Sequence, residues 1–287
     1  MTLEVLICTI DNGISQIPQL LLPRIDGVSY LVSWQHSTHD EITAPDELSR
    51  DDVKIVHLQD RGLSRNRNNA LRNATADICL IADDDCTYRP EYFASIIDTF
   101  KNDTTLDLAT FRMKHSYEGK AYPKHSFNLK HFERGYYVTS FEIAFRRTSV
   151  QGKLEFNELF GLGAPVLQSG EENVFIIEAL KQGLHCRYYP IIVVEHNHAT
   201  TSSTRVGNPG VIMAEGAYIY IAYPCTLLPR LILKAKRLNR SNHLGFFTNL
   251  KHLTAGINYY KKEAISKFRA WLFCCMAWLS LLQAAVA

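Results

Sequence analysis

Three consecutive aspartates, Asp83, Asp84 and Asp85, follow directly on the apolar run Ile-Cys-Leu-Ile-Ala of residues 78–82. The run predicts a short buried strand, so the strand ends in a cluster of carboxylates. Adjacent anions repel one another, and each costs free energy when it leaves water. A divalent cation would relieve the repulsion, and hard oxygen donors suit Mg²⁺ or Mn²⁺. A solvated acidic turn is the alternative to a metal site, and the flanking segments provide the evidence for choosing between them.

Strand-like and helix-like segments alternate around this cluster. Four apolar, β-rich segments predict strands, at residues 3–10, 28–35, 53–58 and 77–82. Residues 64–72, with Ser64 as a possible helix cap, and residues 90–101, with Pro90 in the first turn, predict helices. This alternation is typical of an α/β fold with a parallel sheet and right-handed crossovers.

The strand ends point to one binding edge. Ligands of parallel α/β sheets bind beyond the carboxyl ends of the strands. Thr9, Gln35 and Asp83 end the first, second and fourth predicted strands. We therefore expect these three side chains to converge on one edge of the sheet, where a nucleotide should bind.

The second half of this region adds further elements. Strands are predicted at residues 106–112, 138–145 and 187–195, and a helix from Ser169 to about residue 180. Residues 113–137 form a polar and aromatic excursion, and such loops on a rigid sheet often carry recognition.

The charge of the chain is unevenly distributed. Between Arg230 and Arg269 there are ten Lys or Arg and a single acid, Glu263, which gives this stretch +9 and leaves −7 for the rest of a chain whose total is +2. A basic tail on an acidic body predicts an anionic partner, either nucleic acid or a phospholipid surface. Residues 270–287 are uncharged and, as a helix, would cover roughly 27 Å, just short of a bilayer core of about 30 Å. This stretch predicts a marginal anchor or an interfacial helix, with a core or dimer-interface helix as the alternative.

We therefore expect two domains, an α/β domain at residues 1–205 and a helical, membrane-associating extension at residues 206–287. The seven cysteines include no C-x-x-C pair, and Cys8, Cys79 and Cys186 lie in apolar runs, which fits a reducing compartment. The first residues lack the features of a signal peptide. We expect the chain to work in the cytoplasm, at the cytoplasmic face of a membrane.

Together these segments resemble the inverting family-2 glycosyltransferases of the GT-A fold. The resemblance rests on Gly62-Leu-Ser-Arg-Asn-Arg-Asn-Asn-Ala-Leu71, Asp83-Asp-Asp85 and Gly170-Glu-Glu172, and it covers residues 3–198. The order and spacing of these motifs are more specific than any one of them. The resemblance implies a Rossmann-like, mostly parallel sheet flanked by helices, a nucleotide-sugar donor, usually a UDP-sugar, and a divalent metal as cofactor.

The acidic cluster takes the place of the family's D-x-D motif. By that resemblance Asp85 would ligate Mn²⁺ or Mg²⁺, and Asp83 would contact the metal or the ribose, with Asp84 between them. The cation would offset the charge that develops on the diphosphate as the sugar's C1–O bond breaks. His196 falls where related enzymes sometimes supply a late metal ligand or phosphate contact, and a polar rim residue is the alternative. His198 is a weaker candidate.

The resemblance also implies a set of nucleotide-sugar contacts: Thr9, Gln35, Arg61, Arg67, Asn68, Asp83 and Asp84. Arg67 and Asn68 match the family's Arg-Asn pair, whereas Arg61 would face either the diphosphate or solvent. The second strand departs from the family, because it ends in Trp34-Gln35 where an Asp is common. Gln35 or Trp34 would substitute by hydrogen bonding or stacking, which leaves the identity of the nucleotide open.

An inverting transfer needs a carboxylate that takes the proton of the acceptor hydroxyl. The family's Glu-Asp motif aligns with Glu171-Glu172, which makes Glu172 the first candidate and Glu171 the second. However, Ser169-x-x-Glu172 is also a capping-box pattern. In that alternative Glu172 would bond to its own helix, whose dipole would lower the pKa of its carboxyl.

We therefore predict a metal-dependent inverting glycosyltransferase that moves a sugar to a glycan or lipid-linked acceptor in surface polysaccharide synthesis, at an anionic membrane surface. A non-catalytic carbohydrate-binding or membrane-surface protein on a decayed scaffold is the alternative. A nucleotidyltransferase would need a Gly-rich, Arg-containing loop after the first strand, which Asp11-Asn-Gly-Ile-Ser15 does not provide. Nucleic-acid binding is not expected, because no recognisable motif accompanies the basic stretch.

Overall fold

The chain folds into two compact units in the computed structural model. Unit 1 comprises Met1–Ala164 and Gly170–Thr201, and unit 2 comprises Pro165–Ser169 and Ser202–Ala287. The structure describes residues 1–36, 42–114, 120–133, 136–196, 205 and 207–286, with side chains up to residue 266. His198 and the side chains of residues 270–287 lie outside the described residues.

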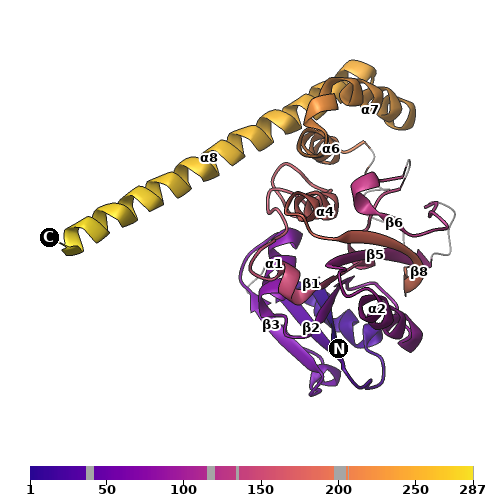
Figure 1. Cartoon of the computed structure of the whole chain (residues 1–287). Helices are drawn as coiled ribbons and strands as arrows, with labels where there is room; N and C mark the ends of the chain where they lie inside the picture. The colour runs from indigo at the N-terminus through magenta and orange to yellow at the C-terminus, as the bar shows by residue number, and fades with distance from the viewer. Residues whose placement is uncertain (37–41, 115–119, 134–135, 197–204, 206, 287) are drawn as a thin grey trace. The chain divides into compact units, whose positions relative to one another are not determined.

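Unit 1 is built on a mixed sheet that has eight strands within the described residues, in the order β3-β2-β1-β4-β7-β5-β8-β6 (Figure 1). The strands are β1 (Leu3–Ile10), β2 (Val28–Gln35), β3 (Val53–Leu58), β4 (Ile78–Asp83), β5 (Leu108–Lys114), β6 (Phe127–Asn128), β7 (Ile143–Arg146) and β8 (Cys186–Glu195). The pairs β1–β2, β1–β4, β2–β3 and β5–β8 are parallel, and β6 and β7 pair antiparallel with their neighbours. The predicted α/β fold class is confirmed.

The helices of unit 1 pack against this sheet. They are α1 (Leu63–Asn73), α2 (Pro90–Asn102), α3 (Arg147–Val150) and α4 (Glu171–Lys181), with the 3₁₀ segments η1 (Asp11–Leu20), η2 (Asp46–Leu48), η3 (Leu129–His131) and η4 (Ser140–Glu142). Pro90 occupies the first turn of α2, as predicted.

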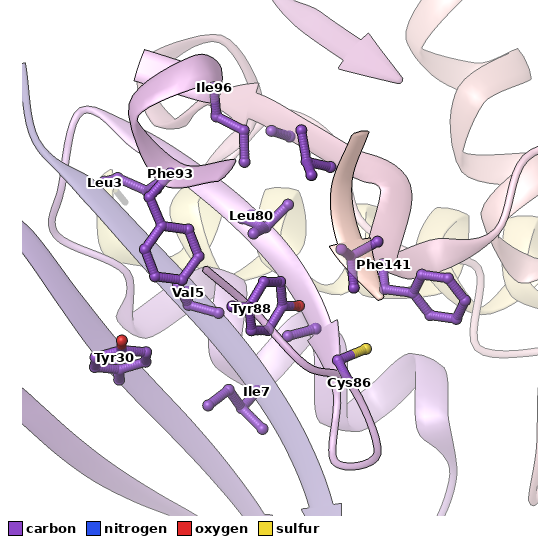
Figure 2. Close-up of a cluster of buried hydrophobic side chains, with 14 of the residues drawn as sticks. Leu3, Val5, Ile7, Tyr30, Leu80, Cys86, Tyr88, Phe93, Ile96 and Phe141 are labelled. Atoms are coloured by element: carbon purple, nitrogen blue, oxygen red, sulfur yellow. The ribbon is translucent and has the colours of Figure 1, made fainter. Parts of the chain in front are cut away.

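Two apolar clusters cover opposite faces of the central strands, because side chains alternate along a strand. Leu3, Val5 and Ile7 of β1 belong to one cluster with Phe93 of α2 (Figure 2). Leu6 and Cys8, which alternate with them along the strand, belong to the other cluster with residues of α1 and α4. The predicted burial of Cys8, Cys79 and Cys186 is confirmed.

Two predicted strands have different bounds in the structure. The segment predicted at residues 106–112 forms β5 two residues later, at Leu108–Lys114. The segment predicted at residues 138–145 begins with the 3₁₀ turn η4, so the strand β7 is only Ile143–Arg146. The turn forms because the carboxylate of Glu142 accepts hydrogen bonds from the backbone N–H groups of Thr139 and Met113.

The predicted Ser64 cap of α1 is wrong. The helix begins at Leu63 after Gly62, whose φ of 127° is a conformation that favours glycine. Ser64 lies inside the first turn, where its hydroxyl donates to the carbonyl of Phe160 at 2.7 Å. Its side chain therefore fastens the helix to a distant segment.

Unit 2 consists of helices packed around a small apolar core. The helices are α6 (Pro209–Ala222), η5 (Pro224–Thr226), α7 (Leu227–Asn242) and α8 (Phe246–Val286). The core residues are Ile212, Ile219, Leu231, Ala235, Leu238, Leu253 and Ile257. Asn208 caps α6, since its side chain accepts from the backbone N–H of Gly210 and Val211.

Among the described residues, no single helix has the length and apolar composition of a membrane span. The segments Pro209–Ala222 and Pro224–Asn242 meet that test only as a pair, with a bend of 112° between them.

Two glycines allow α6 and α8 to pack backbone against backbone. A Cβ on Gly216 would lie 2.0 Å from the carbonyl oxygen of Leu253, and a Cβ on Gly256 would lie 1.9 Å from that of Met213. Both distances are far below contact distance, so any larger residue must push the helices apart.

We expect Gly256→Ala to destabilise unit 2 by about 1–3 kcal/mol through overpacking. Alanine is the better helix former by about 1 kcal/mol, so a loss of stability would show that the clash outweighs propensity. Thermal unfolding followed by circular dichroism measures the effect. The control is Gly207→Ala, where a Cβ would meet nothing closer than 4.0 Å; equal melting temperatures for the two variants would contradict the close approach.

Candidate functional site

The carboxyl ends of β1, β2 and β4 meet at one edge of the sheet. In the parallel register, Thr9 of β1 lies opposite Trp34 of β2, next to Gln35, and Cys8 lies opposite Asp83 of β4. The predicted convergence of Thr9, Gln35 and Asp83 on one edge is therefore confirmed. All the residues of the candidate site belong to unit 1.

Arg67 of α1 lies at the centre of the site. Its Nη2 donates to Asp83 Oδ1 at 2.8 Å, and its Nη1 donates to Glu171 Oε1 at 2.7 Å. The side chain of Arg67 is 1% exposed. One buried guanidinium thus bridges the end of β4 and the start of α4.

The bridge keeps a full positive charge in the interior. Burial by itself would lower the pKa of Arg67, but the carboxylates of Asp83 and Glu171 raise the pKa above its ordinary value. A buried charge is tolerated when it is paired and hydrogen-bonded, and removal of one partner is costly. Both carboxylates are therefore held in place by the same cation.

The segment between β7 and α4 fixes α1, and with it Arg67. Asn68 is fully buried, its amide nitrogen donates to the Phe156 carbonyl at 2.9 Å, and its amide oxygen accepts from the Phe156 N–H at 2.7 Å. The Leu63 N–H donates to the carbonyl of Leu162 at 2.9 Å. The structure thus gives Asn68 a structural role, in place of the predicted contact with a nucleotide.

Asp84 is paired with the end of β1. Thr9 Oγ1 donates to Asp84 Oδ2 at 2.7 Å, and the backbone carbonyl of Thr9 accepts from Asn66 Nδ2 at 2.9 Å. Burial raises the pKa of Asp84, the Thr9 hydroxyl opposes this shift, and the neighbouring aspartates add to it. The carboxylates of the cluster therefore have separate partners, which reduces their mutual repulsion.

Asp85 lies beside the end of β8. Its Oδ2 is 3.1 Å from Nε2 of His196, whose ring stacks on Phe141 with 4.8 Å between centroids. Thus the structure brings Asp85 and His196 together, as the resemblance implied. Asp83 Oδ2 instead accepts from the hydroxyl of Ser140 at 3.0 Å.

The donor set suits a cation that is shared with a substrate. Within the described ranges, no three His, Cys, Asp or Glu side chains form a preassembled metal-binding group. Asp85 and His196 offer an oxygen and a nitrogen side by side. Mg²⁺ in nucleotide enzymes is commonly held by one or two carboxylates together with substrate phosphates. The residues therefore fit a metal whose remaining ligands come from a diphosphate.

Gln35 and Trp34 are used by the fold. Both are 3% exposed. The Gln35 side-chain amide donates to the carbonyl of Asp60, and the Trp34 indole N–H donates to the carbonyl of Asp11 at 2.9 Å. They tie the loops that follow β1 and β3 to the end of β2. Arg61, in contrast, lies on the surface beside this edge.

Glu171 and Glu172 open α4, but the predicted capping box does not form. The residue before the helix is Gly170, with φ 80° in the left-handed region, and no side chain caps this end. Glu172 is therefore not occupied by capping; its Oε1 accepts from Asn173 Nδ2 at 2.8 Å. Glu171, in contrast, is bound to Arg67.

The pKa of Glu172 is shifted opposite to the effect expected of the helix dipole. Burial raises the pKa to about 8 from the ordinary value of 4.5, and the neighbouring negative charge of Glu171 adds to the rise. Arg67 and a backbone hydrogen bond oppose the shift without cancelling it. A carboxyl with a pKa near neutrality is suited to accept a proton in general base catalysis.

A second buried ion pair supports the site, and sequence reasoning missed it. Lys120 and Glu142 are paired with side chains 1% and 0% exposed, and Glu142 also bonds the hydroxyl of Tyr122. Glu142 accepts the backbone N–H of Met113 at 3.2 Å and of Thr139 at 2.9 Å. One carboxylate thus joins the end of β5, the following loop and η4. A single acid within the apolar run at residues 141–145 was the available signal.

Lys120 also extends this network toward the start of α4. Burial lowers the pKa of Lys120, while Glu142 and, more weakly, Glu172 raise it. The ring centroids of Tyr122 and Tyr137 lie 4.9 and 4.5 Å from its ammonium group. The residues around the predicted recognition loop are therefore electrostatically linked to the candidate base.

Comparisons with known proteins agree with this geometry. The family model "Glycosyl transferase family 2" matches residues 37–155. S. aureus TarS 1-349 in complex with UDP is 18% identical, has a TM-score of 0.54 and aligns over 84% of this chain and 71% of that chain. TarS 1-349 in complex with UDP-GlcNAc is 16% identical, has a TM-score of 0.51 and aligns over 84% of this chain and 72% of that chain.

A third structure extends the comparison. The mannosyltransferase PcManGT from Pyrobaculum calidifontis, in complex with GDP-Man and Mn²⁺, is 14% identical, has a TM-score of 0.49 and aligns over 94% of this chain and 79% of that chain. Among curated proteins, no sequence matches the chain significantly.

The sheet, its flanking helices and the likeness to the two TarS structures define unit 1 as a GT-A fold. Residues 37–155 are similar to the family-2 glycosyltransferases. The matched region contains Arg67 and the three aspartates, whereas Glu171 and Glu172 lie beyond it.

We expect Glu172→Gln to stabilise the protein increasingly as the pH rises from about 5 to 8. Because the pKa of Glu172 is raised to about 8, the folded state retains a proton that the unfolded chain releases above its ordinary pKa of 4.5. Wild-type stability therefore falls through this pH window, and the variant, which cannot ionise there, avoids the loss.

Melting temperatures of both proteins across that range provide the measurement. The matched control is Glu178→Gln, on the surface of the same helix and paired with Lys181 at 2.9 Å. A difference between Glu172→Gln and wild type that does not change with pH would rule out the raised pKa.

Proposed function

We propose that the protein is a metal-dependent inverting glycosyltransferase. It moves a sugar from a nucleotide diphosphate sugar, a UDP-sugar in the first place, to a hydroxyl of a glycan or lipid-linked acceptor in surface polysaccharide synthesis. The observation that carries this proposal is the bridge from Asp83 through Arg67 to Glu171. It joins the carboxylates proposed for the donor side to the glutamate pair proposed for the acceptor side.

Glu172 is the general base in this proposal. Glu171 is paired with a buried guanidinium, so a proton arriving there would disrupt the ion pair with Arg67. Glu172 lies next to it with a raised pKa and without a cationic partner of its own among the described ion pairs. The two neighbours therefore have different roles: Glu171 forms the structural ion pair with Arg67, and Glu172 accepts the proton.

The proposed reaction is a single displacement. The acceptor hydroxyl attacks C1 of the donor sugar from the face opposite the diphosphate, and Glu172 takes its proton. The new C1–O bond forms as the bond from C1 to the diphosphate oxygen breaks, so the configuration at C1 is inverted. The nucleoside diphosphate leaves with the bonding electrons and carries the added negative charge.

Mn²⁺ or Mg²⁺ would be held by Asp85 and His196, with Asp83 next to them, and would supply positive charge beside the diphosphate. Arg67 is too deeply enclosed to serve as a surface contact, and it sets the position of Asp83. Thr9 and Asp84, bonded to each other, would line the nucleotide side of the site. Arg61, which is exposed, would contact the diphosphate.

Support for the donor comes from the relatives. TarS 1-349 was solved with UDP and with UDP-GlcNAc, which makes UDP-sugars the first donors to test. The proposed workplace is the cytoplasmic face of a membrane, where lipid-linked acceptors are found. The excess of Lys and Arg between Arg230 and Arg269 favours association with an anionic surface.

A panel of nucleotide sugars with Mn²⁺, read as nucleoside diphosphate release, tests the proposal. We expect turnover with a UDP-sugar, loss of turnover after chelation and recovery on adding Mn²⁺ or Mg²⁺. Asp85→Asn should lower kcat about 100-fold or more, because the charge on the leaving diphosphate is no longer offset as well. No release with any donor, with or without glycan acceptors, would favour a non-catalytic carbohydrate-binding protein.

Glu172→Gln should lower kcat by about 10²–10⁴-fold, the usual contribution of a general base, and leave binding of the nucleoside diphosphate unchanged. Titration calorimetry for binding and single-turnover kinetics for transfer separate the two effects. The same substitution at Glu178, on the exposed side of α4, is the control. If Glu171→Gln abolished transfer in a folded protein while Glu172→Gln did not, the roles assigned to the pair would have to be exchanged.

A further inference from the structure

Unit 2 presents a surface in which cations and apolar side chains alternate. It runs from the second half of α7 through the connecting turn into the first turns of α8. Its members are all exposed, and we call them the basic ridge: Leu233, Lys236, Arg237, Arg240, Leu244, Phe247 and Lys251.

The ridge follows from the amphipathic pattern of α7. Leu233 and the cations three, four and seven positions later fall on one side of the helix. The residues on the opposite side are buried in the core of unit 2: Leu231, Ala235 and Leu238. The basic side is therefore held outward by the packing of the helix itself.

The apolar members of the ridge are unusually exposed. Phe247 is 81% exposed, Leu233 61% and Leu244 41%. Large apolar side chains beside cations are the pattern of a helix that lies at a membrane interface, with its apolar groups at the headgroup boundary.

The cations of the ridge are available to an outside partner. Lys234, which points to the interior side, pairs with Glu215 at 2.7 Å. Among the described residues, Lys236, Arg237 and Arg240 form no such ion pair. Glu263 is the only acid between Arg230 and Arg269, so this stretch of the chain keeps a large excess of positive charge.

We propose that the basic ridge docks the protein onto an anionic phospholipid surface. The cations contact the lipid headgroups, and Leu233, Leu244 and Phe247 enter the boundary between headgroups and acyl chains. Charge complementarity selects the anionic lipid, and the aliphatic side chains favour a bilayer over a single-stranded nucleic acid, whose bases stack on aromatic side chains. Phe247 is the one aromatic ring of the ridge.

This inference rests on the proposed function, because docking would bring the enzyme to the membrane that holds a lipid-linked acceptor. It can be tested without donor sugar or turnover. Binding to vesicles and glycosyl transfer can therefore fail independently.

The experiment compares binding of the full chain to vesicles of phosphatidylcholine alone and with phosphatidylglycerol, by cosedimentation. We expect tighter binding to the anionic vesicles than to the neutral ones, and weaker binding at high salt. The variant Lys236→Glu/Arg237→Glu/Arg240→Glu should weaken it by about 100-fold or more, since each of the three lost cations contributes roughly a factor of five and the added carboxylates repel the lipid. Phe247→Ser should weaken it with little change in salt dependence.

The control carries the same change of net charge on unit 1: Arg24→Glu/Lys101→Glu/Lys181→Glu. All three side chains are at least half exposed. It should bind vesicles like the wild type, and circular dichroism should show that both triple variants are folded.

Four results would overturn the proposal. One is equal binding by the two triple variants, and another is equal binding to neutral and anionic vesicles. The third is tighter binding of the full chain to single-stranded RNA than to anionic vesicles. The wild type could also fail to bind vesicles while Phe247→Ser halves the mass measured in solution. In that case the partner of the ridge would be a second copy of the chain, and the proposal would likewise be overturned.

Discussion

The ion pairs of Arg67 are the interaction on which the site depends. A guanidinium that is 1% exposed bonds Asp83 at the end of β4 and Glu171 at the start of α4. Those carboxylates are 88 positions apart in sequence, and the same cation fixes both. Burial strongly favours this one arrangement, because breaking either ion pair would leave an unpaired charge in the interior. The sheet edge and the first turn of α4 are thereby held in one geometry.

This bridge also explains why two adjacent glutamates differ. Glu171 is paired with the cation, so its negative charge persists beside Glu172. Burial and that charge together raise the pKa of Glu172 to about 8. The polarity of the helix N-terminus acts in the opposite direction but is outweighed. Opposite environments for neighbouring carboxyls are a recurrent way of separating structural from proton-accepting roles.

A second network, centred on Glu142, holds the loop that follows β5. Its carboxylate accepts hydrogen bonds from Lys120, Tyr122 and two backbone N–H groups. Ser140, in the same turn, donates to Asp83. The turn replaces part of a predicted strand because a buried carboxylate has to be hydrogen-bonded, and nearby N–H groups satisfy it. Through this turn the loop is connected to Asp83 of the acidic cluster.

The sequence by itself determined the alternation of strands and helices, the edge at which Thr9 and Asp83 meet, and the acidic cluster, because these follow from local periodicity and chain order. Only the tertiary structure decided which polar residues are used by the fold. Asn68 is enclosed against the Phe156 backbone, and Glu142 is turned into a buried network. Such choices depend on hydrogen-bond partners that are distant in sequence, and no local pattern of residues encodes those partners.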